Sequence, residues 1–208
     1  MGNKCNLYPD EGENYTGVLG NDDDVLLFPD GSRYKGQISN KKPEGKGLLT
    51  RPNGSTHDGE WRNGYAHGYA KATYPNTDIY EGYFEKGKRH GDGKYSSKEF
   101  DYVGNWYQGK MHGHGVIKYK DGRSYEGEFE NDHFNGQGVY TYKSGQRFDG
   151  SFIDGKRHGR GSIIFKDGSV YQGEWSRGQE INTAAYTSKV GNSVIGVWNG
   201  ESFVPKYQ

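Results

Sequence analysis

The sequence predicts an all-β protein, an elongated single sheet built as a meander of about seven to eight β-hairpin repeats. Three observations support this prediction. Aromatic residues make up 15% of the chain, and 35 of its 208 residues are glycine. An aromatic-x-Gly-x-bulky pattern recurs every 22 or 23 residues between positions 34 and 178. Segments such as YEGEF at 125–129 alternate large and charged side chains, the period of a half-buried strand, and no helical periodicity is visible.

Seven copies of the repeat are in phase, and they begin at Tyr34, His57, Tyr80, Tyr102, Tyr125, Phe148 and Tyr171. The third position is always glycine, the fifth is always bulky, and the fourteenth is glycine or alanine. Glycine inside a strand marks the close approach of another group. We therefore expect each glycine to leave room for an aromatic ring to lie over the backbone, which gives a thin aromatic core.

Each repeat is expected to form one hairpin. In the fifth repeat, a loop at 131–136 would separate the strand at 125–129 from a second strand at 137–142. Segments such as KDGR at 120–123 suit tight turns that lead into the next repeat, with glycine at positive φ. Most repeats carry glycine at the eighth position, but two carry Lys41 or Asp132 there, which leaves the shape of those two loops open.

The repeat pattern divides the chain into four segments. Residues 1–14 form an N-terminal tail, 15–33 a degenerate repeat or N-terminal cap, 34–178 the seven repeats, and 179–208 a C-terminal β cap. Repeat arrays need atypical end units, which is why the last segment is assigned as a cap. The open sheet ends suggest an end-to-end homodimer as one alternative.

The charge balance and the cysteine content exclude several classes of protein. The chain has 27 basic and 27 acidic residues, without the basic excess typical of nucleic-acid binders. A single cysteine permits no disulfide within the chain and suits a reducing compartment. No apolar run is long enough to span a bilayer, and no secretory signal is visible. We expect an intracellular, cytoplasmic protein.

One stretch imitates a nucleotide-binding loop. GSFIDGK at 150–156 contains G-x-x-x-x-G-K, and related stretches begin at Gly82 and Gly104. A working loop needs Ser or Thr after the lysine and must join a strand to a helix. Here Arg157 follows, and strands are expected on both sides. The match is a product of the repeat, and no cofactor is expected.

The sequence offers no catalytic or metal-ligating set. Four histidines share the eleventh position, at His67, His90, His112 and His158. Successive repeats advance by about 10 Å, too far for these side chains to share one metal ion. Glutamates alternate with the positions that we expect to be buried, which indicates that they lie on the solvent-exposed face of each strand. No enzyme activity is expected.

The first residues, MGNKC, suit lipid attachment. Gly2 follows the initiator methionine, as in myristoylated proteins, and Cys5 lies where palmitate is often added. The usual pattern has Ser or Thr at the sixth position, where this chain has Asn6. Two acyl chains hold a protein on a membrane, whereas one binds marginally. The alternative is that both residues are there by chance.

The repeat resembles the MORN repeat (membrane occupation and recognition nexus). The resemblance is carried by Y-x-G-x-W-x-x-G-x-x-H-G-x-G and a following Asp-Gly turn, at Tyr102, Gly104, Trp106, Gly109, His112, Gly113, Gly115, Asp121 and Gly122. It covers residues 34 to about 178. The resemblance implies scaffold or adaptor proteins at membrane junctions, in cell division or in ciliary spokes, in which attached domains supply any catalysis.

The main functional hypothesis is a scaffold that docks a partner helix or peptide at a membrane or cytoskeletal assembly. The predicted partner-binding aromatic face comprises Tyr34, Trp61, Tyr80, Phe84, Tyr102, Trp106, Tyr125, Phe129, Phe148, Phe152, Tyr171 and Trp175. One alternative is a structural subunit of a ciliary or axonemal complex. Another is direct binding of acidic phospholipid, with candidate cations at Lys86, Lys88, Arg89, Lys156, Arg157 and Arg160.

Overall fold

The computed structural model describes residues 15–20, 24–198 and 203–206, and these residues form an all-β protein. Its strands are antiparallel and follow one another in chain order, which confirms the predicted hairpin meander. The described residues include no helix long and apolar enough to cross a membrane. The described residues divide into two compact units, an N-terminal unit that ends at residue 112 and a C-terminal unit that begins at residue 113.

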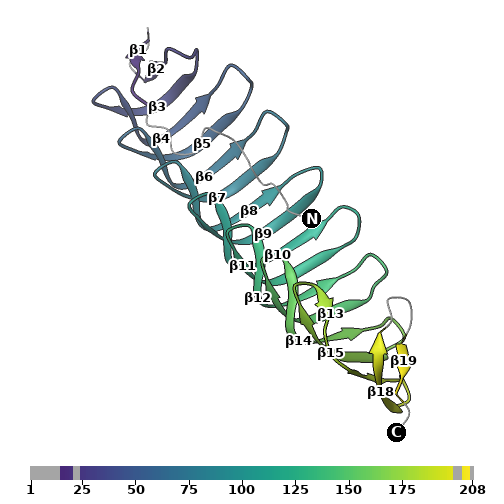
Figure 1. Ribbon diagram of the computed structural model, residues 1–208. Helices are drawn as coiled ribbons and strands as arrows, with labels where there is room; N and C mark the ends of the chain where they lie inside the picture. The colour runs from purple at the N-terminus through teal and green to yellow at the C-terminus, as the bar shows by residue number, and fades with distance from the viewer. Residues whose placement is uncertain (1–14, 21–23, 199–202, 207–208) are drawn as a thin grey trace. The chain divides into compact units, whose positions relative to one another are not determined.

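The N-terminal unit contains the strands of the first repeats, which follow one another as successive hairpins (Figure 1). Strand β2 of the predicted cap pairs with β3 of the first repeat. The strands are β1 (Val18–Leu19), β2 (Val25–Leu27), β3 (Arg33–Ser39), β4 (Lys42–Thr50), β5 (Thr56–Arg62), β6 (Tyr65–Thr73), β7 (Ile79–Glu85), β8 (Lys88–Ser96) and β9 (Phe100–Tyr107).

Strand β10 (Lys110–Tyr119) begins in the N-terminal unit and ends in the C-terminal unit. After the last full repeat, the chain continues the antiparallel pairing through β17 and β18. The strands of the C-terminal unit are β11 (Ser124–Glu130), β12 (His133–Thr141), β13 (Arg147–Ile153), β14 (Lys156–Ile164), β15 (Val170–Ser176), β16 (Gln179–Glu180), β17 (Ala184–Thr187), β18 (Ser193–Trp198) and β19 (Phe203–Pro205).

The hairpin loops are shorter than expected. In the fifth repeat the turn consists of Asn131 and Asp132, and the second strand begins at His133 instead of residue 137. Both turn residues have positive φ, as in type I′ turns, whose twist matches that of the strands. Lys41 also has a positive φ of 58°. The two repeats that lack glycine here therefore keep positive φ at this turn position.

A β-bulge bends most of the hairpins, and in four repeats a tyrosine hydroxyl compensates for the lost pairing. In the fifth repeat the register between β11 and β12 shifts between Gly127 and Phe129. The Tyr125 hydroxyl turns back and donates a hydrogen bond to the carbonyl of Glu128, at 2.9 Å. Bulges leave a backbone group unpaired, so this bond fills a gap in the ladder. The equivalent bonds join Tyr34 to Gln37, Tyr80 to Tyr83 and Tyr102 to Asn105.

Glycine makes room for that tyrosine ring. Gly127 and Gly138 face each other across β11 and β12, and the Tyr125 ring lies over Gly138. A Cβ atom at position 138 would lie 2.5 Å from Cε2 and Cζ of Tyr125. Real Cβ atoms do not approach other atoms so closely. The predicted reason for the glycine spacing is therefore confirmed. A tyrosine ring at the first position of a repeat requires a glycine at the position over which the ring lies.

The rings pack edge to face from one repeat to the next. In the N-terminal unit Tyr80 contacts Phe84 of its own repeat and Trp106 of the next, with centroids 5.0 and 5.3 Å apart. In the C-terminal unit Tyr125 meets Phe129 and Phe152 in the same way, each at 5.2 Å. Such pairs contribute about 0.5–1.5 kcal/mol beyond their area burial. The core of each unit is therefore a column of interlocked rings.

The second repeat departs from the pairing of tyrosine with glycine at both positions. It has His57 in place of the tyrosine and Ala70 in place of the facing glycine. The Ala70 Cβ atom points at Gly59, into the space that a tyrosine ring would need. Because imidazole is shorter than phenol, the alanine is tolerated. The seventh repeat has Ala184 at the same position, near Gly173, but there the strand is interrupted and the Tyr171 hydroxyl bonds the Glu180 carboxylate instead.

This coupling predicts the outcome of a double-mutant cycle. His57→Tyr should lower the free energy of unfolding by about 1–3 kcal/mol, because the new ring overlaps the Ala70 Cβ atom. Adding Ala70→Gly should recover at least about 1 kcal/mol, since the ring then gains its usual place and the carbonyl of Glu60 as acceptor. Urea unfolding of the four proteins measures the coupling. Strictly additive effects would contradict it, and Gly138→Ala serves as a control that recreates the overlap.

Candidate functional site

The structure buries the aromatic residues that we predicted to face a partner. None of the twelve is more than 5% exposed, because they form the ring column inside the bent hairpins. The predicted exposed face at these positions is therefore wrong. The residues concerned are Tyr34, Trp61, Tyr80, Phe84, Tyr102, Trp106, Tyr125, Phe129, Phe148, Phe152, Tyr171 and Trp175. Their alternation identified the inward face of each strand, but the bend of the hairpin closes that face from solvent.

The C-terminal unit contains an open groove of about 380 Å³. We call it the tyrosine groove, because Tyr119, Tyr140 and Tyr142 line it together with Phe134. These four rings come from the end of β10, from β12 and from the turn after β12. Each of them is half-buried, unlike the rings of the column. The groove therefore offers aromatic surface that a ligand can reach.

Ring contacts fix the floor of the tyrosine groove. Phe134 stacks on the buried Tyr125, with centroids 3.8 Å apart and an interplanar angle of 16°. Tyr140 meets Tyr142 edge to face at 4.8 Å. Arg123 donates from Nη1 to the Tyr140 hydroxyl at 3.3 Å, and its guanidinium lies 4.6 Å from the Tyr119 ring centroid. The aromatic surface is thus held in place by the repeats below it.

Three cations accompany these rings, namely Arg123, Lys156 and Arg157. The Arg157 guanidinium lies 5.5 Å from the Phe148 ring centroid and 5.7 Å from that of Trp175, and it donates to the Gly178 carbonyl. Burial raises the pKa of Tyr142, and the positive charge of Arg157 opposes that rise. The charge of Arg157 is therefore felt at the groove surface.

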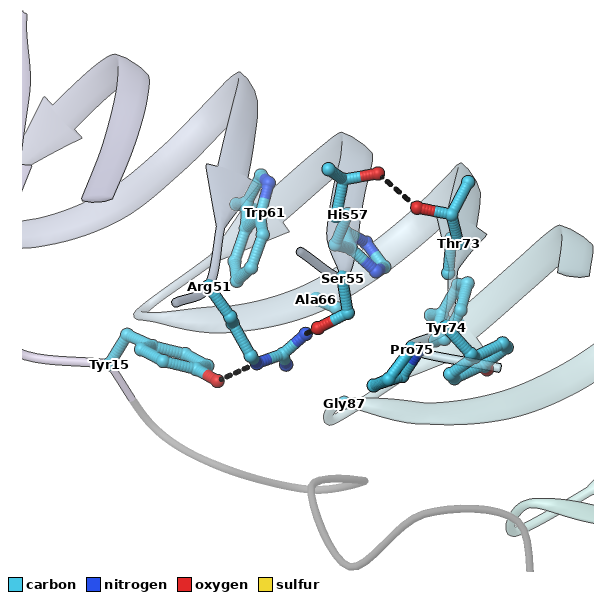
Figure 2. A pocket seen from close by; sticks show the side chains of 13 residues that line it. Tyr15, Arg51, Ser55, His57, Trp61, Ala66, Thr73, Tyr74, Pro75 and Gly87 are labelled. Atoms are coloured by element: carbon cyan, nitrogen blue, oxygen red, sulfur yellow. Dashed lines mark hydrogen bonds between the residues drawn. The ribbon is translucent and has the colours of Figure 1, made fainter. Parts of the chain in front are cut away.

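The N-terminal unit has a smaller cavity, of about 40 Å³, in its second repeat (Figure 2). It exists because Ala66 and Ala72 stand where other repeats place larger residues such as Met111 and Ile117. At its edge Arg51 donates to the Tyr15 hydroxyl at 3.0 Å, as Figure 2 shows. A cavity of this size has room for about one water molecule.

His57 borders this cavity and is 5% exposed. Its ring contacts Trp61 and Phe84 edge to face, at 4.9 and 4.6 Å. Its Nε2 atom is buried and has no hydrogen-bond partner among the described residues. Burial, together with the nearby charge of Arg51, lowers the pKa of His57 from 6.5 to about 3. The imidazole is therefore neutral in the folded protein at neutral pH.

One of the cations that we considered for phospholipid binding belongs to the core. Arg89 is 1% exposed, and its guanidinium lies 4.2 Å from the Trp106 ring centroid. Arg157 is half-buried and lines the tyrosine groove, as described above. The histidines at the eleventh position do not form a cluster either. His90 lies beside Glu85, with its Nδ1 atom 3.5 Å from the Oε2 atom of the glutamate. The described part of the chain holds no cluster of three or more potential metal ligands.

The strands around residues 150–156 show that the G-x-x-x-x-G-K match is not a nucleotide-binding loop. Gly150 lies in β13, Gly155 in the two-residue turn, and Lys156 at the start of β14. No helix follows the lysine, so the backbone cannot form the phosphate cradle that the motif requires. Gly2 and Cys5, the predicted lipidation residues, lie outside the described residues.

The sequence interpretation missed the residues of the tyrosine groove. Tyr140 and Tyr142 occupy the sixteenth and eighteenth positions of the fifth repeat, and Phe134 occupies the tenth. The tenth position varies between Pro43, Arg89 and Phe134, so it did not stand out as part of the pattern. Aromatic residues at positions that the repeat does not fix are the signal that could have found them.

His57 makes the stability of the protein sensitive to mild acid. The unfolded chain takes up a proton at this residue below about pH 6.5, whereas the folded protein does so only near pH 3. Folding is therefore weakened as the pH falls from 7, by about 2 kcal/mol at pH 5 from this residue. Urea unfolding at both pH values should show that this loss disappears in His57→Tyr/Ala70→Gly. His133→Gln, at an exposed histidine, should leave it unchanged, and an equal loss in all three proteins would contradict the assignment.

Two solved domains are similar to this chain at low sequence identity. The TCP10 domain of Danio rerio CPAP in complex with a peptide of Danio rerio STIL is similar, with 14% identity and a TM-score of 0.47, over 83% of this chain and 73% of that one. The SAS-4 (dCPAP) TCP domain of Drosophila melanogaster in complex with a proline-rich motif of Ana2 (dSTIL) has 13% identity and a TM-score of 0.48, over 84% and 88%. No curated protein gave a significant match.

The MORN repeat family matches most of the chain. Its seven matches lie at residues 34–56, 57–79, 80–99, 102–122, 125–147, 148–170 and 171–180. The matches begin at the same seven residues as the repeats of the sequence analysis. The chain therefore belongs to the MORN-repeat family.

Proposed function

We propose that this protein is a non-catalytic scaffold that holds a segment of a partner protein in its tyrosine groove. The observation that carries the proposal is the groove itself, where Phe134, Tyr140 and Tyr142 are half-buried and line one open space, whereas the rings at the first and fifth positions of the repeats are buried in the core. Tyrosine and arginine are the residues that most often dominate protein–protein contacts. The groove combines both types on a rigid support.

The chemistry of the groove favours binding over catalysis. Its lining contains no Ser, Thr or Cys side chain that could act as a nucleophile. The imidazole of His133 is exposed, and its Nδ1 atom lies 2.9 Å from the Asn131 carbonyl of its own turn. A general base needs a substrate group or nucleophile within hydrogen-bond reach. These features support a scaffold and give no support to an enzyme.

Site-specific photo-crosslinking tests the proposal. A benzophenone amino acid in place of Tyr142 should crosslink the protein to a discrete partner in cells that express it, because the ring faces the groove. The same amino acid in place of Glu126, an exposed residue of β11, is the matched control. Crosslinked products are identified by mass spectrometry. No intermolecular product at 142, or the same products at both positions, would contradict partner binding in the groove.

We further propose that this scaffold is tethered to a membrane through Gly2 and Cys5, by myristate and palmitate. The support is the sequence MGNKC, and two acyl chains are sufficient for stable anchoring. In membrane flotation from eukaryotic cells, the wild-type protein should float and Gly2→Ala should remain at the bottom. Cys5→Ser should float only partly, since a single chain binds marginally. If the wild-type protein does not float, a soluble cytoskeletal or axonemal role replaces the membrane-bound one.

A further inference from the structure

We propose that the tyrosine groove selects an acidic peptide segment that carries a large apolar anchor residue. This inference rests on the proposed scaffold function and names the chemistry of its partner. Three cations line the groove, Arg123, Lys156 and Arg157, and Asp132 is the carboxylate that lines it with them. The chain as a whole has no net charge, so this local excess is a property of the groove.

Arg157 supplies a charge that is already fixed in position. Its guanidinium lies 5.5 and 5.7 Å from the ring centroids of Phe148 and Trp175, and its Nη2 atom donates to the Gly178 carbonyl at 3.2 Å. An arginine held in this way loses little further conformational entropy when an anion binds. Arg157 and Tyr142 line the same groove, and the positive charge of Arg157 opposes the rise in the pKa of Tyr142 that burial causes. A carboxylate near Tyr142 would therefore be attracted without any rearrangement of Arg157.

Lys156 supplies a second, mobile charge. It stands at the start of β14, next to the two-residue turn, and its side chain is exposed. It forms no ion pair with a described residue. Arg123 is different, because it is bonded to the Asp121 carboxylate at 2.8 Å and to Tyr140. We therefore assign anion attraction to Lys156 and Arg157, and positioning of Tyr140 to Arg123.

The rings supply the apolar part of the site. Phe134, Tyr140 and Tyr142 present half-buried faces around a volume of about 380 Å³, which lies within the range of pockets that take one or more large groups. A leucine or aromatic side chain can pack against these faces and remove them from water. The combination of an apolar anchor and an adjacent acidic residue matches both halves of the groove. A basic segment would meet repulsion from the same cations.

Selection from a random peptide library tests this chemistry on the purified full-length protein. A displayed library of twelve-residue peptides is selected on the wild-type protein and counter-selected on Tyr142→Ala. Enriched peptides should contain Asp or Glu within three positions of a Leu, Phe, Tyr or Trp. Synthetic copies should bind in fluorescence anisotropy, and replacing their acids by Asn or Gln should weaken binding. Lys156→Glu should weaken it about fivefold, since it reverses a charge at the rim.

The matched control is Lys118→Glu, an exposed lysine on β10 that does not line the groove. It changes the net charge equally and should leave peptide affinity unchanged. The proposal fails if the library yields no enriched peptides, if the enriched peptides are not acidic, or if Lys118→Glu and Lys156→Glu act alike. Crosslinking at position 142 distinguishes a failure of the acidic preference from a failure of the scaffold function. A partner crosslink combined with non-acidic peptides would keep the scaffold function and overturn only the acidic preference.

Discussion

The packing of an aromatic ring over a glycine, which a tyrosine hydroxyl reinforces in four repeats by bonding a backbone carbonyl, is the interaction on which most of the hairpins depend. Tyr125 shows all three parts: the bulge after Gly127, the close approach to Gly138 and the bond to Glu128. Burial raises the pKa of the equivalent Tyr34 hydroxyl to about 12, so the donor proton stays in place at any physiological pH. The bulge bends the strand, the ring fills the bend, and the hydroxyl pairs the group that the bulge releases.

This constraint decides which aromatic residues are available to contact a partner. A ring at the first or fifth position of a repeat is needed by its own hairpin and by the next one, as the contacts of Tyr80 with Phe84 and Trp106 show. Even arginine is drawn into this core at the tenth position, where Arg89 lies over Trp106. Function must therefore rest on positions that the repeat leaves variable. Phe134, Tyr140 and Tyr142 occupy such positions.

The second repeat shows how the same constraint tolerates variation. His57 and Ala70 depart from the pattern together, because a shorter ring leaves space for a methyl group. The exchange has a cost, since the Nε2 atom of His57 is buried without a described partner and a small cavity remains beside it. Buried polar groups without partners are expensive. This repeat is therefore the place where acid acts most directly on the N-terminal unit.

Much of the fold could be predicted from the sequence, because its signals are local. Alternation, the glycine spacing and the turn residues act within one repeat of 22 or 23 residues, and they determined the strands, the ring-and-glycine packing and the family. Tertiary structure alone decided which aromatic faces are accessible. A period of two assigns Tyr125 and Phe129 to one face of a strand, but it cannot tell whether the bend of the hairpin covers that face. The tyrosine groove likewise depends on rings from β10, from β12 and from the turn after β12, which only folding brings around one space.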